Sequence, residues 1–362
     1  MALPKILHVA SGDLWGGAEA AVYELCGGLR DRGHPVMAVI MNPGELAQRL
    51  HAAGIRTETL DERRESSPKL AARLRRCIAE FRPDVVHGHR TKENVLAALV
   101  SFSLGPAHPR LVKTLHGAPE HRRGALWSRR GLAQLVDSAT DSVYAARVAV
   151  SSDLARRMAS DGARELVTIH NGLAPPPPRP HIPAADRDQV VGFGGRLVPV
   201  KRVDLLLRVA AEVKQLRGTR VGFEIAGEGP LKTELEALSS KLGLGDVVEF
   251  TGFSADIWSR LARWDATMLT SDHEGLPMVC LESLAAGVPM LARQVGGLGE
   301  VILGPEQGEL VDSADPKLIA VRLISLLESE ARRTERASRL PETFTREAMC
   351  RSYASLYEQV IS

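Results

Sequence analysis

The chain has 362 residues, of which 44% are apolar and 25% are charged. This composition is typical of a soluble globular protein, and the length is sufficient for two domains of ordinary size. The formal net charge is only +2, so the overall charge gives no support for nucleic-acid binding, and any basic partner surface must be a local patch. We therefore expect no nucleic-acid partner.

The four cysteines are far apart and form no C-x-x-C pair; they are Cys26, Cys77, Cys280 and Cys350. This spacing argues against a disulfide framework or a zinc site and favours a reducing compartment. The first residues lack the apolar region of a signal peptide, and no stretch approaches the ~18 apolar residues that span a bilayer. The sequence therefore predicts a cytoplasmic protein, either free or peripheral on a membrane.

In the first half of the chain, short apolar, β-branched runs alternate with helical patterns. The predicted strands are residues 5–10, 35–41, 84–89, 110–117, 147–152 and 166–172. Four apolar residues at helical spacing follow the first strand: Ala18, Val22, Leu25 and Leu29. Gly33 then stands where a C-terminal cap belongs. The alternation predicts a parallel α/β domain over residues 1–173.

A proline-rich segment, residues 174–188, follows this domain. Five prolines fall between Pro175 and Pro180, and proline interrupts both helices and sheet ladders, so we interpret the segment as a linker. Predicted strands then resume at residues 190–195, 221–229, 247–252, 266–271 and 289–293. They indicate a second parallel α/β domain over residues 189–343. Residues 344–362 form a last helix with one apolar face, made of Met349, Tyr353, Leu356 and Val360.

The loops after the predicted strands are rich in glycine, charge and histidine, and ligands bind at this edge of open parallel sheets. Gly16 and Gly17 form a turn into a helix, where backbone amides can contact an anion at the positive end of the helix dipole. A plain strand-to-helix turn is the alternative. His87, His89 and His116 end predicted strands, where an imidazole either contacts a ligand or serves as a packing residue.

Two cations follow the first strand of the second domain. Arg196 and Lys201 lie five residues apart across a turn, which suits a diphosphate, although each alone is also typical of a solvated surface charge. Leu197 replaces the third glycine of G-x-G-x-x-G, and Leu231 replaces the glycine of a P-loop. The only Asp-x-Asp triplet, Asp186–Asp188, falls in the linker, so we expect no divalent metal.

The stretch HEGLPMVCLE, residues 273–282, holds two carboxylates at the same predicted edge. Glu274 belongs to the loop and Glu282 to the early part of the next helix, while Pro277 suits the first turn of that helix. A carboxylate accepts hydrogen bonds in pairs and therefore matches the vicinal hydroxyls of a sugar or ribose. A helix-capping glutamate and a surface glutamate are the alternative interpretation.

At these residues the chain resembles retaining glycosyltransferase family 4, whose members transfer a sugar from a nucleotide donor without a catalytic metal. The E-x7-E marker of the family corresponds to Glu274 and Glu282. Other motifs occur in family order: GGAE, PDVVHGH, TLHG, IHNG, GRLVPVK, IAGEGP, FTGF and GVPMLARQVGG. The resemblance implies the α/β GT-B fold, with two Rossmann-like parallel-sheet domains facing across a cleft and a C-terminal helix that crosses back onto the N-terminal domain.

The resemblance also implies residue roles. The residues that it places at the reaction are Glu274, His116, Arg196 and Lys201. Arg196 and Lys201 would hold the donor diphosphate, Glu282 the ribose, and Glu274 the hydroxyls of the transferred sugar. The backbone that would surround sugar and phosphate is that of Gly275, Leu276, Pro277 and Met278. Gly16 and Gly17 would close over the diphosphate, and the base would lie near Gly227, Glu228 and Phe253.

The expected activity is transfer of a hexose-type sugar, with retention, to a saccharide or lipid acceptor in cell-envelope polysaccharide, lipopolysaccharide or glycolipid synthesis. The nucleotide sugar, of UDP, GDP or ADP type, is a co-substrate, and no cofactor is implied. A front-face route and a double displacement through Glu274 both remain open. The alternatives are a nucleotide-sugar epimerase of the same fold, a phosphorylase-like enzyme with a lysine that holds pyridoxal phosphate, and a non-enzymatic sugar-binding module.

Two basic segments of the first domain bear on the acceptor. One, residues 63–83, carries an apolar helical face flanked by Arg73, Arg75 and Arg76. The other, residues 121–131, surrounds Trp127 with arginines. Basic amphipathic segments dock on anionic lipid headgroups, so we hypothesise a lipid-linked acceptor at the inner face of a membrane. A core-packed helix with a solvated face is the alternative.

Overall fold

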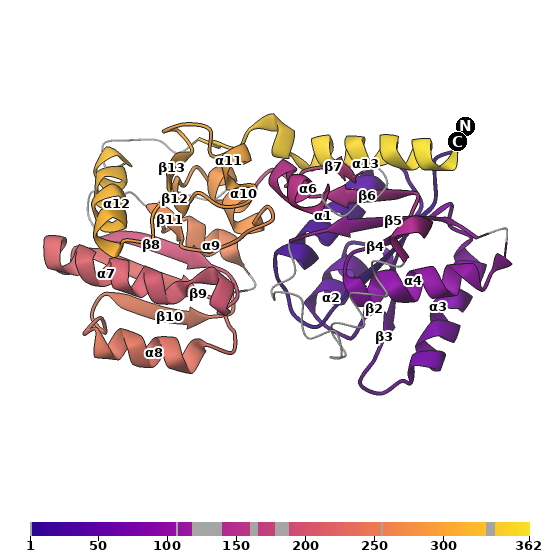
Figure 1. Ribbon diagram of the computed structural model, residues 1–362, viewed down its shortest axis with the longest axis horizontal. Coiled ribbons are helices and arrows are strands. Elements are labelled where there is room, and N and C mark those ends of the chain that lie inside the picture. Colours follow the sequence, from indigo (N-terminus) through magenta and orange to yellow (C-terminus); the bar gives the residue numbers. More distant parts are fainter. Residues whose placement is uncertain are drawn as a thin grey trace. The chain divides into compact units, whose positions relative to one another are not determined.

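The computed structural model describes residues 2–105, 108–117, 140–159, 166–177, 188–254, 256–330 and 337–362. The chain forms two compact units. Unit 1 comprises Met1–Ala174 and Thr343–Ser362, and unit 2 comprises Pro175–Glu342. Figure 1 labels the elements of each.

The centre of unit 1 is a seven-stranded parallel sheet in the order β3-β2-β1-β4-β5-β6-β7. Its strands are β1 Ile6–Ser11, β2 Val36–Met41, β3 Arg56–Leu60, β4 Val85–Gly88, β5 Arg110–Leu115, β6 Ala146–Ala149 and β7 Leu166–Thr168. Strand β3 was not predicted, because its sequence RTETL is polar. As an edge strand it pairs only with β2, so its side chains need not be apolar.

The helices of unit 1 are α1 Gly17–Asp31, α2 Glu45–Ala52, α3 Ser67–Phe81, α4 Thr91–Phe102, α6 Ser152–Met158 and α13 Arg346–Ile361. Successive residues of β1 face opposite sides of the sheet, as the two-residue period of a strand requires. Ile6 and Ala10 join one core cluster with α1, α2 and α13, and Leu7 and Val9 join the other with α3 and α4. The sheet is therefore covered on both faces.

The last helix, α13, packs along α1 within unit 1, as the yellow helix in Figure 1 shows. Met349, Tyr353 and Leu356 are buried in the core, and Val360 is partly buried against it. The prediction of a C-terminal helix that returns to the first domain is therefore confirmed. Thr345 caps the helix by accepting a hydrogen bond from the amide of Ala348.

Helix α3 carries the first of the two basic segments. Its apolar face is buried in the core and consists of Leu70, Leu74, Cys77 and Ile78. Arg73 forms ion pairs with Glu58 and Glu65, and Arg76 pairs with Glu80. The structure thus supports the core-packed interpretation of this helix. The second segment, residues 121–131, lies outside the described residues, and among those that are described no helix is both long and apolar enough to cross a membrane.

Unit 2 contains a six-stranded parallel sheet in the order β10-β9-β8-β11-β12-β13. Its strands are β8 Gln189–Gly194, β9 Val221–Ala226, β10 Val248–Gly252, β11 Ala266–Leu269, β12 Met290–Arg293 and β13 Gly308–Val311. Its helices are α7 Val203–Arg217, α8 Lys232–Lys241, α9 Ile257–Leu261, α10 Met278–Ala285, α11 Leu298–Val301 and α12 Pro316–Glu330. The edge strand β13 was also not predicted, since four residues of mixed polarity carry no strand period.

In both sheets the chain first adds strands on one side of a central strand. It then restarts on the other side of that strand and adds the remaining strands there. The restart lies between β1 and β4 in unit 1 and between β8 and β11 in unit 2. Loops from two such strands diverge and leave a crevice at their carboxyl ends, which is where ligands bind in open α/β sheets. The predicted site residues lie after these central strands and after the strands β5, β9 and β10, or on the helix α10.

Candidate functional site

In unit 2 the loops after β8 and β11 are joined by hydrogen bonds. The hydroxyl of Thr270 donates to the carbonyl oxygen of Arg202 over 2.8 Å, and the amide of Asp272 donates to the carbonyl oxygen of Val200 over 2.9 Å. These bonds bring a cation that precedes α7 beside a carboxylate that precedes α10.

That cation is Lys201, and the carboxylate is Glu274. The Nζ atom of Lys201 lies 2.7 Å and 2.8 Å from the two carboxylate oxygens. Ser271 adds a hydrogen bond from its hydroxyl to Oε1 over 2.6 Å. The side chains of Lys201 and Glu274 are only 19% and 7% exposed, so this pair is much better shielded than a surface salt bridge. Sequence analysis missed Ser271, although it ends the predicted strand just before HEGLPMVCLE.

The Glu274 loop also depends on a close approach of glycine. Gly296, after β12, has φ +56°, and a Cβ atom there would lie 1.9 Å from the carbonyl oxygen of Glu274. The amide of Gly297 donates to the carbonyl oxygen of Gly275 over 2.8 Å. The glycines of the GVPMLARQVGG motif therefore shape the loop that carries the acid.

Helix α10 begins directly after this loop. Pro277 occupies its N-cap position, and the four residues from Gly275 to Met278 are all buried. The first amides of a helix have no partner within the helix and carry its positive dipole end. Glu282 is half-buried, in the second turn of the helix. Burial, together with the Glu274 carboxylate, raises the pKa of the Cys280 thiol.

The loops after β8 and β9 form a second junction at the same edge. Gly195 donates its amide to Ala226, and Leu197 donates to Glu228 over 2.9 Å, so the half-buried Arg196 lies between two fixed residues. A Cβ atom on Gly227 would lie 1.9 Å from the carbonyl oxygen of Gly195.

Two of the residues predicted near the base are exposed at this edge. Glu228 is exposed and pairs with Lys232 over 2.8 Å. Phe253, directly after β10, is 49% exposed, which is unusual for an aromatic side chain and leaves its ring open to stacking. The structure thus joins Lys201 and Glu274 directly, and the other donor-site residues predicted in unit 2 lie on loops at the same sheet edge or on α10.

In unit 1 the predicted residues lie after β1, β4 and β5. Gly16 is the N-cap of α1, and Gly17 is its first residue. Glu19, in the first turn, is buried and pairs with Arg90, which follows β4. Sequence analysis did not single out this pair, although Glu19 belongs to the GGAE motif and Arg90 directly follows PDVVHGH.

The predicted histidines of unit 1 form a polar cluster in which His87 and His89 are buried and His116 is half-buried. His89 hydrogen-bonds to His8 over 3.0 Å and to His116 over 3.2 Å. His87 hydrogen-bonds to the hydroxyls of Tyr357 over 2.7 Å and of Thr114 over 2.8 Å. Sequence analysis missed His8. Its only signal was a polar residue at a core-facing position of an otherwise apolar strand.

These histidines are neutral near physiological pH. Burial lowers the pKa of His8 to about 3. Burial and the nearby Arg90 guanidinium lower the pKa of His116 to about 3 as well. Burial, with the neighbouring imidazoles, lowers the pKa values of His87 and His89 well below the ordinary range.

The cluster has the residue types of a metal site, since ligand atoms of His8, His87 and His89 lie within 4.8 Å of one another. Both nitrogens of His87 are engaged, however, by Tyr357 and Thr114. A metal would have to displace one of these hydroxyls. Asp186 and Arg187 of the Asp-x-Asp triplet lie outside the described residues.

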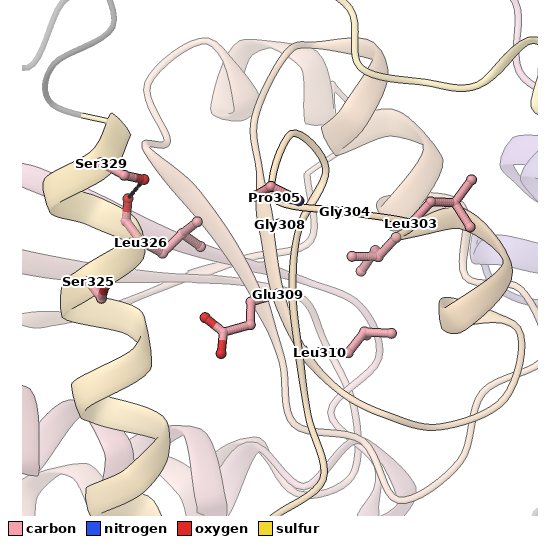
Figure 2. A pocket seen from close by; sticks show the side chains of 10 residues that line it. Leu303, Gly304, Pro305, Gly308, Glu309, Leu310, Ser325, Leu326 and Ser329 are labelled. Carbon is pink, nitrogen blue, oxygen red and sulfur yellow. Dashed lines mark hydrogen bonds between the residues drawn. The ribbon is translucent and has the colours of Figure 1, made fainter.

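A hollow of about 470 Å³ lies beside α12 and β13 of unit 2, and Figure 2 shows its lining. Glu309 supplies the only carboxylate of that lining, and it pairs with Arg322 over 3.4 Å. The hydroxyl of Ser329 donates to the carbonyl oxygen of Leu326. No predicted site residue lines this hollow, so we place the site at the sheet edge instead.

Comparisons with known proteins agree with this fold. The family model "Glycosyltransferase Family 4" matches residues 15–175, and "Glycosyl transferases group 1" matches residues 179–342. The Rhizobium meliloti (strain 1021) lipopolysaccharide core biosynthesis glycosyltransferase LpsD is 28% identical over 99% of both chains. A D-inositol 3-phosphate glycosyltransferase of Thermomonospora curvata is 35% identical over 40% of this chain and 36% of its own length.

Among solved structures, Anabaena Alr3699/HepE in complex with UDP and glucose has a TM-score of 0.79. It is 22% identical to this chain and covers 98% of it and 100% of its own length. Two Rossmann-like parallel-sheet units in one chain define the GT-B fold class. With both family models matched in sequence along the chain, the protein belongs to glycosyltransferase family 4.

Proposed function

We propose that the protein transfers a hexose-type sugar from a nucleotide-sugar donor, with retention of configuration and without a catalytic metal. The observation that carries this proposal is the buried group of Lys201, Glu274 and Ser271 in front of α10. It combines a cation for a diphosphate, an acceptor for sugar hydroxyls and the amide-rich start of a helix within one loop junction.

The chemistry follows from the charges that develop during transfer. As the bond between sugar and phosphate breaks, the sugar gains positive charge and the diphosphate gains negative charge. Arg196, Lys201 and the first amides of α10 stabilise the diphosphate. Glu274 positions the sugar through its hydroxyls, and Glu282 binds the ribose. In unit 1 we assign Gly16, Gly17 and His116 to donor binding, on the resemblance to the family.

Retention allows two routes. In the front-face route the departing phosphate removes the proton of the acceptor hydroxyl, and no covalent intermediate forms. In a double displacement Glu274 attacks the sugar. The front-face route is favoured because Lys201 already binds both oxygens of Glu274. Intact-mass analysis during turnover distinguishes them, since only the double displacement leaves a sugar on the enzyme.

The acceptor that we propose is a saccharide or lipid of the cell envelope, lipid-linked and reached at the inner face of the membrane. The relative LpsD, named for lipopolysaccharide core biosynthesis, aligns over 99% of both chains and supports this class. Vesicle flotation with and without anionic lipid tests the membrane contact, and binding that does not depend on anionic lipid would reject it.

The donor is tested by incubating the protein with UDP-, GDP- and ADP-sugars and candidate acceptors while nucleoside diphosphate release is measured. We expect release from one donor class that increases with acceptor. An isomer formed from the donor alone would indicate an epimerase. Donor binding without release or transfer would indicate a sugar-binding module.

The site assignment is tested with Glu274→Gln, which retains hydrogen-bonding atoms but removes the charge. We expect transfer to fall at least ~100-fold with folding intact, since interactions with developing charge are of this size. Lys201→Ala alone would leave the buried Glu274 carboxylate unpaired. It is therefore combined with Glu274→Gln, and the double variant is compared with Glu274→Gln alone. Lys214→Ala, which removes an exposed ion pair with Asp246, is the matched control and should leave transfer unchanged. Full activity in Glu274→Gln would refute the assignment.

A further inference from the structure

We propose that His8, His89 and His116 form a neutral chain of three imidazoles that fixes the hydrogen-bonding state of His116, and that His89 is a positioning residue for sugar transfer. The role of His89 rests on the proposed function. The existence of the chain does not, and it is tested separately below.

The geometry provides one continuous line of hydrogen bonds. His8 Nδ1 lies 3.0 Å from His89 Nε2, and His89 Nδ1 lies 3.2 Å from His116 Nε2. The remaining nitrogens, His8 Nε2 and His116 Nδ1, are buried and have no hydrogen-bond partner among the described residues. His8 lies on β1, while the other two imidazoles follow β4 and β5. The chain therefore runs across the central strands toward the carboxyl edge of the sheet.

Counting protons restricts this chain to two arrangements. Three neutral imidazoles carry three N–H protons, and each of the two hydrogen bonds needs one proton between its nitrogens. Because each ring has a single proton, the rings must all be protonated on Nε2 or all on Nδ1. A mixed arrangement places two protons, or none, in one of the bonds. Burial keeps the rings neutral, as the lowered pKa values of the three histidines indicate.

The state of His116 Nδ1 is consequently set by the whole chain. In the arrangement with every proton on Nε2, this nitrogen is an acceptor for a sugar hydroxyl. In the other arrangement it is a donor. In a histidine with no partner on its second nitrogen, either ring nitrogen can carry the proton. In this chain, moving the proton of His116 to its other nitrogen requires the same move at His89 and His8. Such fixed orientation of a polar group before substrate arrives is a property that favours catalysis.

His87 lies outside the chain and has a different task. Its two nitrogens bind Tyr357 and Thr114, and the hydroxyl of Thr114 also hydrogen-bonds to Tyr353. This network ties α13 to the sheet and holds the His87 ring 4.2 Å from that of His89, centroid to centroid. His87 therefore braces the position of His89.

The chain itself is tested by ¹H–¹⁵N correlation spectra of the full-length protein labelled with ¹⁵N-histidine, which report the protonated nitrogen of each ring. We expect His8, His89 and His116 to be neutral near pH 7 and to show the same tautomer, or the same tautomer ratio. His89→Phe should abolish this agreement between His8 and His116. Different tautomers in the unmodified protein would overturn the proposal. Stoichiometric bound zinc, detected by elemental analysis, would overturn it too, because the rings would then be metal ligands.

The positioning role is tested by kinetics. His89→Phe keeps a ring of similar shape but removes both bonds, so we expect kcat to fall about ten-fold while the donor KM changes less than about two-fold. His89→Gln, which retains a donor and an acceptor, should recover most of the loss. His51→Phe, at an exposed position on α2, is the control and should have no effect.

Unchanged kcat in folded His89→Phe, or equal loss in the Gln and Phe variants, would reject the positioning role. If the unmodified protein transfers sugar from no nucleotide donor, the proposed function fails, while the spectra still decide whether the chain exists.

Discussion

At the scale of single residues, Gly192 shows how closely the core of unit 2 is packed. A Cβ atom at this position of β8 would lie 1.8 Å from the ring of Trp264, which is fully buried. The first strand of the domain therefore needs glycine for space, although the same glycine resembles part of a nucleotide-binding fingerprint in sequence.

Gly192→Ala should accordingly destabilise the protein by about 3 kcal/mol, because the ring cannot move without disturbing the core. Chemical unfolding monitored by tryptophan fluorescence measures the change. Gly245→Ala is the matched control in the same unit, since an added Cβ meets nothing within 4 Å there. It should change stability by less than about 0.5 kcal/mol. Equal effects of the two substitutions would contradict this account of the core.

The buried histidines predict a specific loss of stability in acid. Their pKa values in the folded protein are lowered from 6.5, to about 3 for His8 and His116. Below pH 6.5 the unfolded chain therefore binds protons that the folded protein does not. The contribution is fully present above pH 6.5 and is lost as the pH falls toward about 3, at about 1.4 kcal/mol per pH unit for each histidine.

Urea unfolding between pH 7 and pH 4 measures this slope. His8→Gln should reduce the dependence of the unfolding free energy on pH by the contribution of one histidine. His51→Gln, at an exposed site, should not change it. A slope that is the same in all three proteins would show that His8 becomes protonated in the folded state.

At the scale of secondary-structure elements, α13 is held by polar contacts as well as by its apolar face. Tyr357 is fully buried and hydrogen-bonds to His87, and Arg346 pairs with Glu24 of α1. Tyr357→Phe should cost about 1 to 3 kcal/mol, since it leaves a buried imidazole nitrogen without its partner. Tyr23→Phe, on the half-buried face of α1, should be close to neutral. Equal melting temperatures for the two variants would contradict a structural role of the Tyr357 hydroxyl.

Strands with an apolar run could be predicted from the sequence, including the edge strands β7 and β10, whereas the edge strands β3 and β13 could not. Val36–Met41 and Ala266–Leu269 are buried on both faces and read as continuous apolar runs. Arg56–Leu60 and Gly308–Val311 have a neighbour on one side only, so their pairing depends on the strand beside them. That information is absent from their own residues.

The candidate site, like the fold, could be predicted from the sequence only in part. Glu274 and Lys201 were identified because they belong to loops with recognisable motifs. Their direct contact depends on hydrogen bonds between loops that are about 70 residues apart, which spacing alone does not reveal. His8 was overlooked because its chemistry arises from neighbours on β4 and β5.

At the scale of the whole molecule, unit 1 is built from two distant parts of the chain. Deleting residues 346–362 would expose the core residues that α13 covers, so we expect unit 1 to unfold while unit 2, which has its own sheet, remains folded. Hydrogen exchange measured by mass spectrometry distinguishes the units. Deletion of residues 361–362 alone is the control. If the variant without residues 346–362 loses protection from hydrogen exchange in both units, the two units do not fold independently.

Because unit 1 is built from two distant parts of the chain, it also determines the order in which the two units can fold during synthesis. Residues 1–174 are translated before unit 2, but the part of the α1 surface that α13 covers stays exposed until α13 follows more than 170 residues later. Unit 2 is continuous and has all its strands before that point. Unit 2, which is translated second, should therefore be the first to complete its fold. Until α13 has been translated, the apolar face of α1 that it covers must be protected in the nascent N-terminal half.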